Sequence, residues 1–363
     1  MKTTLTLLTA LLLAPLAALH AAEPPDWPAE VQAPFAKLKV PDLGLKPLLE
    51  PKGKRITTKD GWAEERSRLD AVWRKQLGPL PKKATELAVR VEKTEELDGC
   101  TRQLITFETG DGDRIRAYLL VPGHLRKGEK APAVVVFHQS TKDTILEPAG
   151  LGKDQTLANG LHLVKRGYVV LCPECYILKE VKRGEEVGTR WPGLTGLGKM
   201  TFDASRCIDF LVSLAYVDAE RIGCLGHSLG AKGVLYAMAF EPRYRVGVFN
   251  EGGIGLRMSN WTDPWYLTAA FKPNIPELEH HQLLALCAPR AFLVLGGDNS
   301  DGDASWPFIH AALPVYRLLD AGDRIGLVNH YMGHAYPTQA RRQSYRWLDH
   351  WLDHRPTKEE VGP

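Results

Sequence analysis

The chain has 363 residues, of which 44% are hydrophobic and 25% charged, and its formal net charge at pH 7 is +3. This length and apolar fraction suit one large α/β domain with a modest extension. The basic residues are dispersed along the chain, which argues against a nucleic-acid partner. Six cysteines do not make a disulfide scaffold at this size, although export would permit a bridge.

The first residues have the pattern of a secretory signal peptide. Lys2 precedes an apolar run from Leu5 to Leu16, and small residues follow up to Ala21 and Ala22. The run is too short to span a bilayer, and no later stretch is long enough. The sequence therefore predicts that residues 1–22 are removed and that the mature protein is secreted or periplasmic, without stable membrane insertion.

Residues 23–90 are expected to form an N-terminal arm and one helix packed on the main domain. The arm is rich in proline and lysine. Between Asp60 and Leu77, Trp62, Leu69 and Trp73 recur at helical spacing. Aromatic residues at this spacing usually lie in a core, so the helix is expected to bury them.

Residues 91–355 are expected to form an α/β domain. Residues 87–91, 104–107 and 115–121 alternate like antiparallel strands. Short apolar runs separated by helical stretches follow at residues 133–137, 168–171, 221–225, 246–249, 291–295 and 325–328. Buried strands alternating with helices imply a mostly parallel, doubly wound sheet. Two segments rich in Gly, Trp and Pro, 177–200 and 252–278, are expected to be lid-like insertions above the strand ends.

A G-x-S-x-G motif, Gly226-His227-Ser228-Leu229-Gly230, lies between one of these apolar runs and a helical stretch. A turn this tight between a buried strand and a helix requires residues without side chains two positions before and after the serine. It lifts the serine hydroxyl above the sheet, within reach of substrate. The motif therefore predicts Ser228 as a nucleophile.

A serine hydroxyl needs a base, and the base needs an acid that orients it. On such a sheet both should follow Ser228 in loops after strands. His334 meets this condition after residues 325–328, and it is the predicted base. Three acids remain open: Asp303 and Asp301 in the loop after residues 291–295, and Glu251 in the loop after residues 246–249.

The oxyanion of the reaction requires two hydrogen-bond donors. One is expected to be the backbone N–H of Leu229 at the start of the helix, and the other that of Gln139 in the loop after residues 133–137. This chemistry requires no metal or cofactor. Cys172 and Cys175 have a metal or redox spacing, but they stand without a second pair, so buried thiols or one local disulfide are the favoured interpretation.

From about residue 100 to 352 the chain resembles the α/β-hydrolase superfamily, and most closely its dienelactone hydrolase-like and acetyl xylan esterase-like branch. The motif around Ser228, the segment from Ile208 to Gly223, and Gly333-His334 carry this resemblance. True dienelactone hydrolases use a cysteine nucleophile, whereas Ser228 argues for an ordinary ester as substrate. The resemblance implies an α/β-hydrolase fold.

A more specific resemblance is to glucuronoyl esterases. These enzymes are similar in having a lysine four residues after the nucleophile, here Lys232, and an acid at the position of Glu251. They differ in having an arginine directly after the serine, where this chain has Leu229. Lys232 lies one helical turn from Ser228, so it is a candidate for binding a substrate carboxylate. Trp261 and Trp265 are candidates for a sugar-stacking surface, with packing of the insertion as the alternative.

These observations predict a secreted serine carboxylic-ester hydrolase that acts on an esterified or acylated plant polysaccharide, as acetyl xylan esterases or glucuronoyl esterases do. One alternative is a prolyl oligopeptidase-like serine peptidase, which shares the fold and the triad; the lack of room for a propeller domain argues against it. The other alternative is a non-catalytic hydrolase fold that binds carbohydrate.

Overall fold

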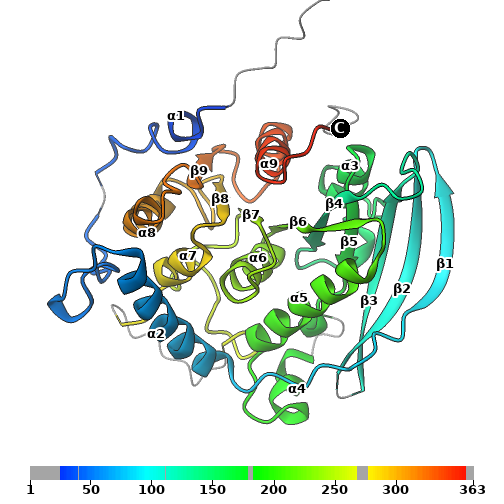
Figure 1. Cartoon of the computed structure of the whole chain (residues 1–363), viewed down its shortest axis with the longest axis horizontal. Helices are drawn as coiled ribbons and strands as arrows, with labels where there is room; N and C mark the ends of the chain where they lie inside the picture. Colours follow the sequence, from blue (N-terminus) through cyan, green and yellow to red (C-terminus); the bar gives the residue numbers. More distant parts are fainter. Residues whose placement is uncertain (1–24, 40, 111, 179–182, 268–276, 357–363) are drawn as a thin grey trace, which may run out of the picture.

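The computed structural model describes residues 25–39, 41–110, 112–178, 183–267 and 277–356. Within these residues the chain forms a nine-stranded sheet (Figure 1). Its strands lie in the order β1-β2-β3-β5-β4-β6-β7-β8-β9. Their bounds are β1 Arg90–Leu97, β2 Cys100–Gly110, β3 Asp113–Pro122, β4 Ala131–Phe137, β5 Val169–Pro173, β6 Val217–His227, β7 Val246–Asn250, β8 Ala291–Gly296 and β9 Ile325–Asn329. The predicted signal peptide, residues 1–22, falls outside the described residues.

The first three strands are antiparallel and the rest of the sheet is parallel. β1 pairs with β2, β2 with β3 and β3 with β5 in antiparallel register, whereas β5, β4, β6, β7, β8 and β9 run parallel to one another. The expected strand at 87–91 is displaced, because β1 covers residues 90–97. This edge strand is mostly exposed and rich in charge, so hydrophobic alternation does not mark it.

Helices cover both faces of the sheet, as the α/β-hydrolase resemblance implies (Figure 1). α5, α6, α7 and α8 pack with α2 on one face, and α1, α3 and α9 on the other. The helix bounds are α1 Trp27–Val31, α2 Lys59–Leu77, α3 Asn159–Lys165, α4 Arg183–Arg190, α5 Gly196–Ser213, α6 Leu229–Phe240, α7 His281–Cys287, α8 Trp306–Leu318 and α9 Thr338–Trp351. The parallel strands are buried on both faces, which accounts for their continuous apolar sequences.

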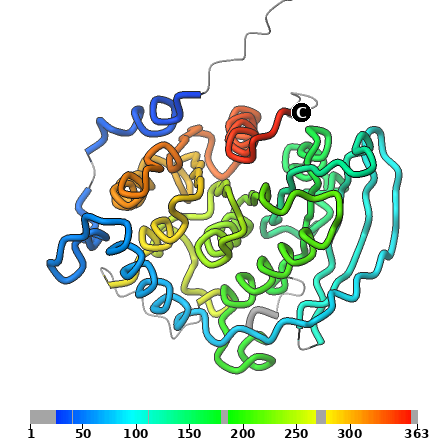
Figure 2. The backbone as a smooth tube through the Cα atoms, viewed as in Figure 1, coloured from blue at the N-terminus to red at the C-terminus, as the bar shows by residue number. Residues whose placement is uncertain are grey.

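The segment before the sheet packs against the domain, and α1 and α2 provide two of its attachments (Figure 2). Trp27 in α1 packs edge-on against Trp347 in α9, with ring centroids 4.8 Å apart. Trp73 in α2 is buried, and its indole nitrogen donates to Gln282 Oε1 of α7 at 2.8 Å. The helical spacing of its aromatics thus predicted the buried face of α2 correctly. Among the described helices, none has the length and apolarity that a membrane span requires.

A buried ion cluster joins α5 to the antiparallel strands. Lys199 is completely buried, and its ammonium forms salt bridges with Asp113 of β3 at 2.8 Å and with Asp203 one turn along α5. Burial raises the pKa of Asp203 to about 6, although Lys199 opposes this shift. Removal of the lysine would leave two carboxylates buried together, which is costly.

We therefore expect Lys199→Met to lower the free energy of unfolding by about 3–5 kcal/mol at pH 7, the usual cost of breaking a buried pair. The matched control is Lys83→Met, because Lys83 forms a 3.0 Å salt bridge with Asp209 at the surface, where the lysine side chain is 43% exposed. A pair that is partly open to solvent should contribute less than a buried one, about 1 kcal/mol or below. Urea unfolding of both variants measures the difference, and equal losses would contradict the expectation.

Candidate active site

The predicted elbow forms a strained turn between β6 and α6. Ser228 has φ 56° and ψ −117°, directly after the last residue of β6 and before Leu229, which begins the helix. A Cβ on Gly226 would lie 2.2 Å from the carbonyl carbon of Gly230, and a Cβ on Gly230 would lie 2.2 Å from the carbonyl oxygen of Phe137. Both glycines are therefore required by close backbone approach. The backbone N–H of Ser228 donates to the carbonyl of Asn250 at 2.8 Å.

A second strained residue, Glu251, follows the adjacent strand. Its φ is 55°, and its backbone N–H donates to Leu295 of β8 at 3.0 Å. The buried carboxylate accepts a hydrogen bond from His334 Nδ1 at 3.1 Å. It also accepts from the backbone N–H of Ser300 at 2.7 Å and from that of Gly297.

These contacts keep Glu251 ionised. Burial would raise the pKa of its carboxyl, but hydrogen bonds from His334, Ser300 and Gly297 outweigh burial and hold the pKa below its usual value. A carboxylate only accepts hydrogen bonds, so Nδ1 of His334 carries the proton in this contact. The other ring nitrogen, Nε2, is then available as a base.

The other two candidate acids have different partners. Asp301 is buried and accepts from the backbone N–H groups of Gly253 at 2.6 Å and Ile254 at 2.8 Å. Asp303 accepts from Asn329 Nδ2 at 2.8 Å and from the Tyr331 hydroxyl at 3.2 Å.

Within the described part of the chain, the carboxylate hydrogen-bonded to His334 is therefore that of Glu251. Asp301 fixes the loop that follows Glu251, and Asp303 fixes the loop that leads to His334. The order of the residues along the chain did not separate these roles, because all three acids follow strands of the same sheet edge.

The two expected oxyanion donors lie on elements that touch. Leu229 is the first residue of α6, so its backbone N–H is unpaired within the helix. The loop after β4 is held by His138, whose Nε2 accepts from the backbone N–H of Cys175 at 3.0 Å and whose Nδ1 donates to Gln139 O at 2.7 Å. Gln139 itself donates through its side chain to Glu147 at 3.0 Å. These bonds orient the loop in which the Gln139 N–H lies.

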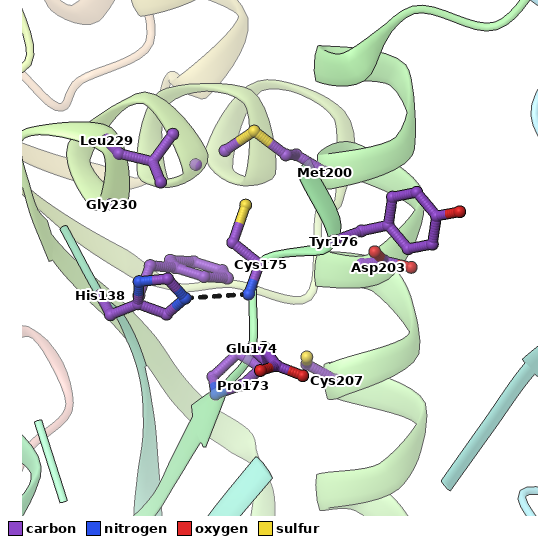
Figure 3. Close-up of a pocket in the computed structure, with 12 residues that line it drawn as sticks. His138, Pro173, Glu174, Cys175, Tyr176, Met200, Asp203, Cys207, Leu229 and Gly230 are labelled. Carbon is purple, nitrogen blue, oxygen red and sulfur yellow. Dashed lines mark hydrogen bonds between the residues drawn. The ribbon is translucent and has the colours of Figure 1, made fainter. Parts of the chain in front are cut away.

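A mostly apolar cavity adjoins this region (Figure 3). Leu229 and Gly230 border it from α6, His138 from the loop after β4, and Met200 from α5. Figure 3 shows the thiol of Cys175 and the thioether of Met200 directed into it. The apolar side chain directly after the nucleophile thus faces an apolar space.

Lys232 is buried one helical turn after Ser228. Its ammonium donates to Gly252 O at 3.1 Å and to Ser259 Oγ at 2.7 Å, and it lies 3.9 Å from the centroid of the Trp261 ring. Among the described residues it forms no ion pair with a carboxylate. Burial lowers the pKa of Lys232 to about 7. In this arrangement the lysine holds the segment that follows Glu251.

The two candidate stacking tryptophans differ in accessibility. Trp261 is fully buried, and its indole nitrogen donates to Gly253 O at 2.7 Å, so the prediction that it stacks on a sugar has to be corrected: it has no free ring face. Trp265 is 36% exposed and keeps an accessible surface. All six cysteines are free thiols, and no group of three or more metal-binding side chains occurs in the described residues.

The sequence reasoning missed the residues that surround the triad candidates. Gly297 and Ser300 donate their backbone N–H groups to Glu251. Both lie in the loop after β8, in which the sequence had drawn attention only to the aspartates. Asn250, directly before Glu251, bonds both to the elbow and to the loop of His334. The sequence signal that could have identified Asn250 is a polar residue directly after the predicted buried strand 246–249.

The geometry can be compared with known proteins. A model of the prolyl oligopeptidase family matches residues 159–355, which is more than half of the chain and contains Ser228, Glu251 and His334. The chain belongs to the prolyl oligopeptidase family. The matched segment contains all the parallel strands except β4.

Individual relatives add detail. A 4-O-methyl-glucuronoyl methylesterase from Hypocrea jecorina is 23% identical over 336 residues, covering 83% of this chain and 68% of its own length. A second protein of this name, from Sodiomyces alcalophilus, is 31% identical over 163 residues, which are 36% of this chain and 32% of that protein. A glucuronoyl esterase from Solibacter usitatus superposes with a TM-score of 0.67 at 20% identity, covering 86% of this chain and 99% of that one. This structural likeness shows the α/β-hydrolase fold.

The lowered pKa of the buried Lys232 leads us to expect that the stability of the protein depends on pH. The folded pKa of Lys232 is about 7, whereas an unfolded lysine titrates near 10.4. Between these values the unfolded chain binds a proton that the folded chain does not, so stability rises with pH by at most about 1.4 kcal/mol per pH unit. We expect Lys232→Met to remove this slope between pH 7 and 10. Urea unfolding across that range measures it, and parallel stability curves for the two proteins would contradict it.

Proposed function

We propose that this protein is a serine carboxylic-ester hydrolase with Ser228 as nucleophile, His334 as base and Glu251 as the orienting acid. The observation that carries the proposal is the buried Glu251 carboxylate bonded to His334 Nδ1, beside a strained G-x-S-x-G turn on the neighbouring strand. The names of the relatives, which are methylesterases and glucuronoyl esterases, support the ester as the bond that is cleaved.

The mechanism follows from these positions. Ser228 Oγ attacks the ester carbonyl while His334 Nε2 takes its proton, and Glu251 stabilises the imidazolium that forms. The backbone N–H groups of Leu229 and Gln139 bind the oxyanion, with the positive end of α6 behind them. His334 then returns the proton to the alcohol that leaves. Water, activated by the same imidazole, hydrolyses the acyl-enzyme and releases the acid.

We propose a carbohydrate-linked ester, in an esterified or acylated plant polysaccharide, as the substrate. The names of the relatives, which are carbohydrate esterases, and the partly exposed Trp265 support a sugar. The apolar Leu229 at the edge of the cavity favours a neutral group near the oxyanion site. The signal-peptide pattern of residues 1–22 supports secretion or periplasmic export, where such polymers are found.

Lys232 is proposed to act on the substrate indirectly. Its ammonium is already bonded to Gly252 and Ser259, so it orders the loop between Glu251 and Trp265. A substrate carboxylate would have to displace one of these bonds to reach it. This is a weaker basis for carboxylate binding than the sequence spacing suggested.

The assignment of the acid is tested by three substitutions measured against Ser228→Ala as the inactive reference. Glu251→Gln should lower kcat by roughly ten-thousandfold, because the imidazole loses its orienting carboxylate. Asp303→Asn should retain most of the activity, since the Asp303 carboxylate bonds to Asn329 and Tyr331 and, among the described residues, not to His334. Steady-state hydrolysis of an aryl acetate by folded protein provides the measurement. A Glu251→Gln enzyme within tenfold of wild type would refute the assignment.

The reaction class is tested by a substrate panel. Acetylated xylan, methyl glucuronate esters, feruloyl esters and short aryl esters are compared with aminoacyl-proline nitroanilides at equal enzyme concentration. We expect turnover of at least one ester class to exceed that of every anilide. Faster cleavage of the anilide would assign the protein to the peptidases, and no turnover of any substrate would favour a binding protein.

A further inference from the structure

Asn250 joins the nucleophile elbow to the loop of the proposed base. It is the last residue of β7, between β6 and β8, and its side chain is completely buried. Its backbone carbonyl accepts from the N–H of Ser228 at 2.8 Å. Its side-chain nitrogen lies 2.7 Å from His227 Nδ1 and 3.2 Å from the carbonyl oxygen of Ala335. One residue therefore touches the neighbours of both Ser228 and His334.

The orientation of this amide is fixed by its partners. The carbonyl of Ala335 can only accept a hydrogen bond, so the nitrogen of the Asn250 side chain has to face it. The same nitrogen then uses its second hydrogen to donate to His227 Nδ1. A flipped amide would place its oxygen against the oxygen of Ala335.

This orientation also fixes the state of His227. A ring nitrogen that accepts from an amide carries no proton, so neutral His227 has its proton on Nε2. Burial, reinforced by the nearby His334, lowers the pKa of His227 to about 4. The His227 ring lies 4.8 Å from the His334 ring and is nearly parallel to the Tyr336 ring at 6.1 Å. A neutral ring thus packs against the base.

The position of Asn250 also carries an unfavourable contribution to stability, which an apolar residue at this position would avoid. Asn250 Oδ1 is buried and has no hydrogen-bond partner among the described residues. A buried acceptor without a partner is usually unfavourable by about 1–3 kcal/mol. An apolar side chain of similar size would avoid this cost but could donate to neither His227 nor Ala335. The two donated bonds are therefore the reason for asparagine at this position.

We propose that Asn250 is a positioning residue of the hydrolytic reaction, which holds the elbow and the His334 loop in register and keeps a neutral His227 against the base. The inference rests on the proposed roles of Ser228 and His334. It assigns a function to the residue before Glu251 and to the residue before the nucleophile. Neither residue needs to touch the substrate.

The protonation state of His227 provides a test that does not depend on activity. Nitrogen-15 NMR of the histidine-labelled full chain distinguishes the two neutral tautomers, and His227→Phe identifies the signal. We expect His227 to be neutral from pH 5 to 8 with its proton on Nε2. We expect Asn250→Asp to move that proton to Nδ1, because a carboxylate accepts instead of donating. A proton on Nδ1 in the unmutated protein would overturn the proposal.

Kinetics test the consequence for the reaction. Misplacement of a reacting group by about 1 Å can cost on the order of a hundredfold in rate. We expect Asn250→Asp to lower kcat on an aryl acetate about a hundredfold, with KM changed less than threefold. The added charge beside His227, His334, His330 and Glu251 favours protonated imidazole, so the acid limb of the kcat profile should move to higher pH. Asn250→Ala should lower kcat without this shift.

The matched control is Asn159→Asp, a second buried asparagine whose side chain bonds to Tyr345 and Leu157 away from the elbow. Its kcat per folded molecule should equal that of the unmutated protein. Equal losses of kcat in the two variants, or an unshifted profile in Asn250→Asp, would overturn the positioning role. Turnover that survives Ser228→Ala would instead refute the proposed function, while the NMR result would stand by itself.

Discussion

The structure depends on two strained turns at the ends of neighbouring parallel strands. Ser228 after β6 and Glu251 after β7 both have φ near 55°. Left-handed backbone is unfavourable for residues with side chains, and it persists where the surroundings determine it fully. Here each residue donates its N–H to the adjacent strand, Ser228 to β7 and Glu251 to β8. The hydrogen bonds between neighbouring strands thus continue one residue beyond β6 and β7. Ser228 and Glu251 therefore both lie at the carboxyl-terminal edge of the parallel strands.

This constraint explains why two buried carboxylates in one region behave differently. Asp301 and Glu251 influence each other electrostatically, and burial raises the pKa of Asp301 to about 6 despite its bonds to Ile254, Ser305 and Gly253. Glu251 additionally receives a hydrogen bond from His334, which helps keep its pKa low. Titratable neighbours whose pKa values are driven apart are characteristic of sites with assigned acid and base roles. The environment therefore separates the carboxylate bonded to His334 from the one that stabilises a loop.

The sequence predicted the parallel part of the fold well because buried strands and the elbow depend on local patterns. Continuous apolar runs identified each parallel strand, and two glycines around Ser228 identified the turn. The edge strand β1 was placed incorrectly because its side chains face solvent and carry no alternation. The choice among Asp303, Asp301 and Glu251 depends on which of the three carboxylates lies within hydrogen-bond distance of His334. This distance is set by the folded sheet and not by the order of the residues along the chain. The burial of Trp261 likewise depends on contacts with Lys232 and His280 from other elements.

The residue after the nucleophile links the site to its substrate. The resemblance to glucuronoyl esterases implies an arginine at the position of Leu229, and this chain has an apolar side chain there instead. The leucine faces a mostly apolar cavity, whose lining includes Met200, Phe137 and Gly233 together with the polar side chains of His138, Glu174 and Asp203. Lys232, the feature shared with those esterases, is occupied by bonds to the backbone and to Ser259. The fold shared with those esterases therefore comes with a different charge distribution next to Ser228: an apolar side chain follows the serine, and the buried lysine is already occupied by bonds within the protein.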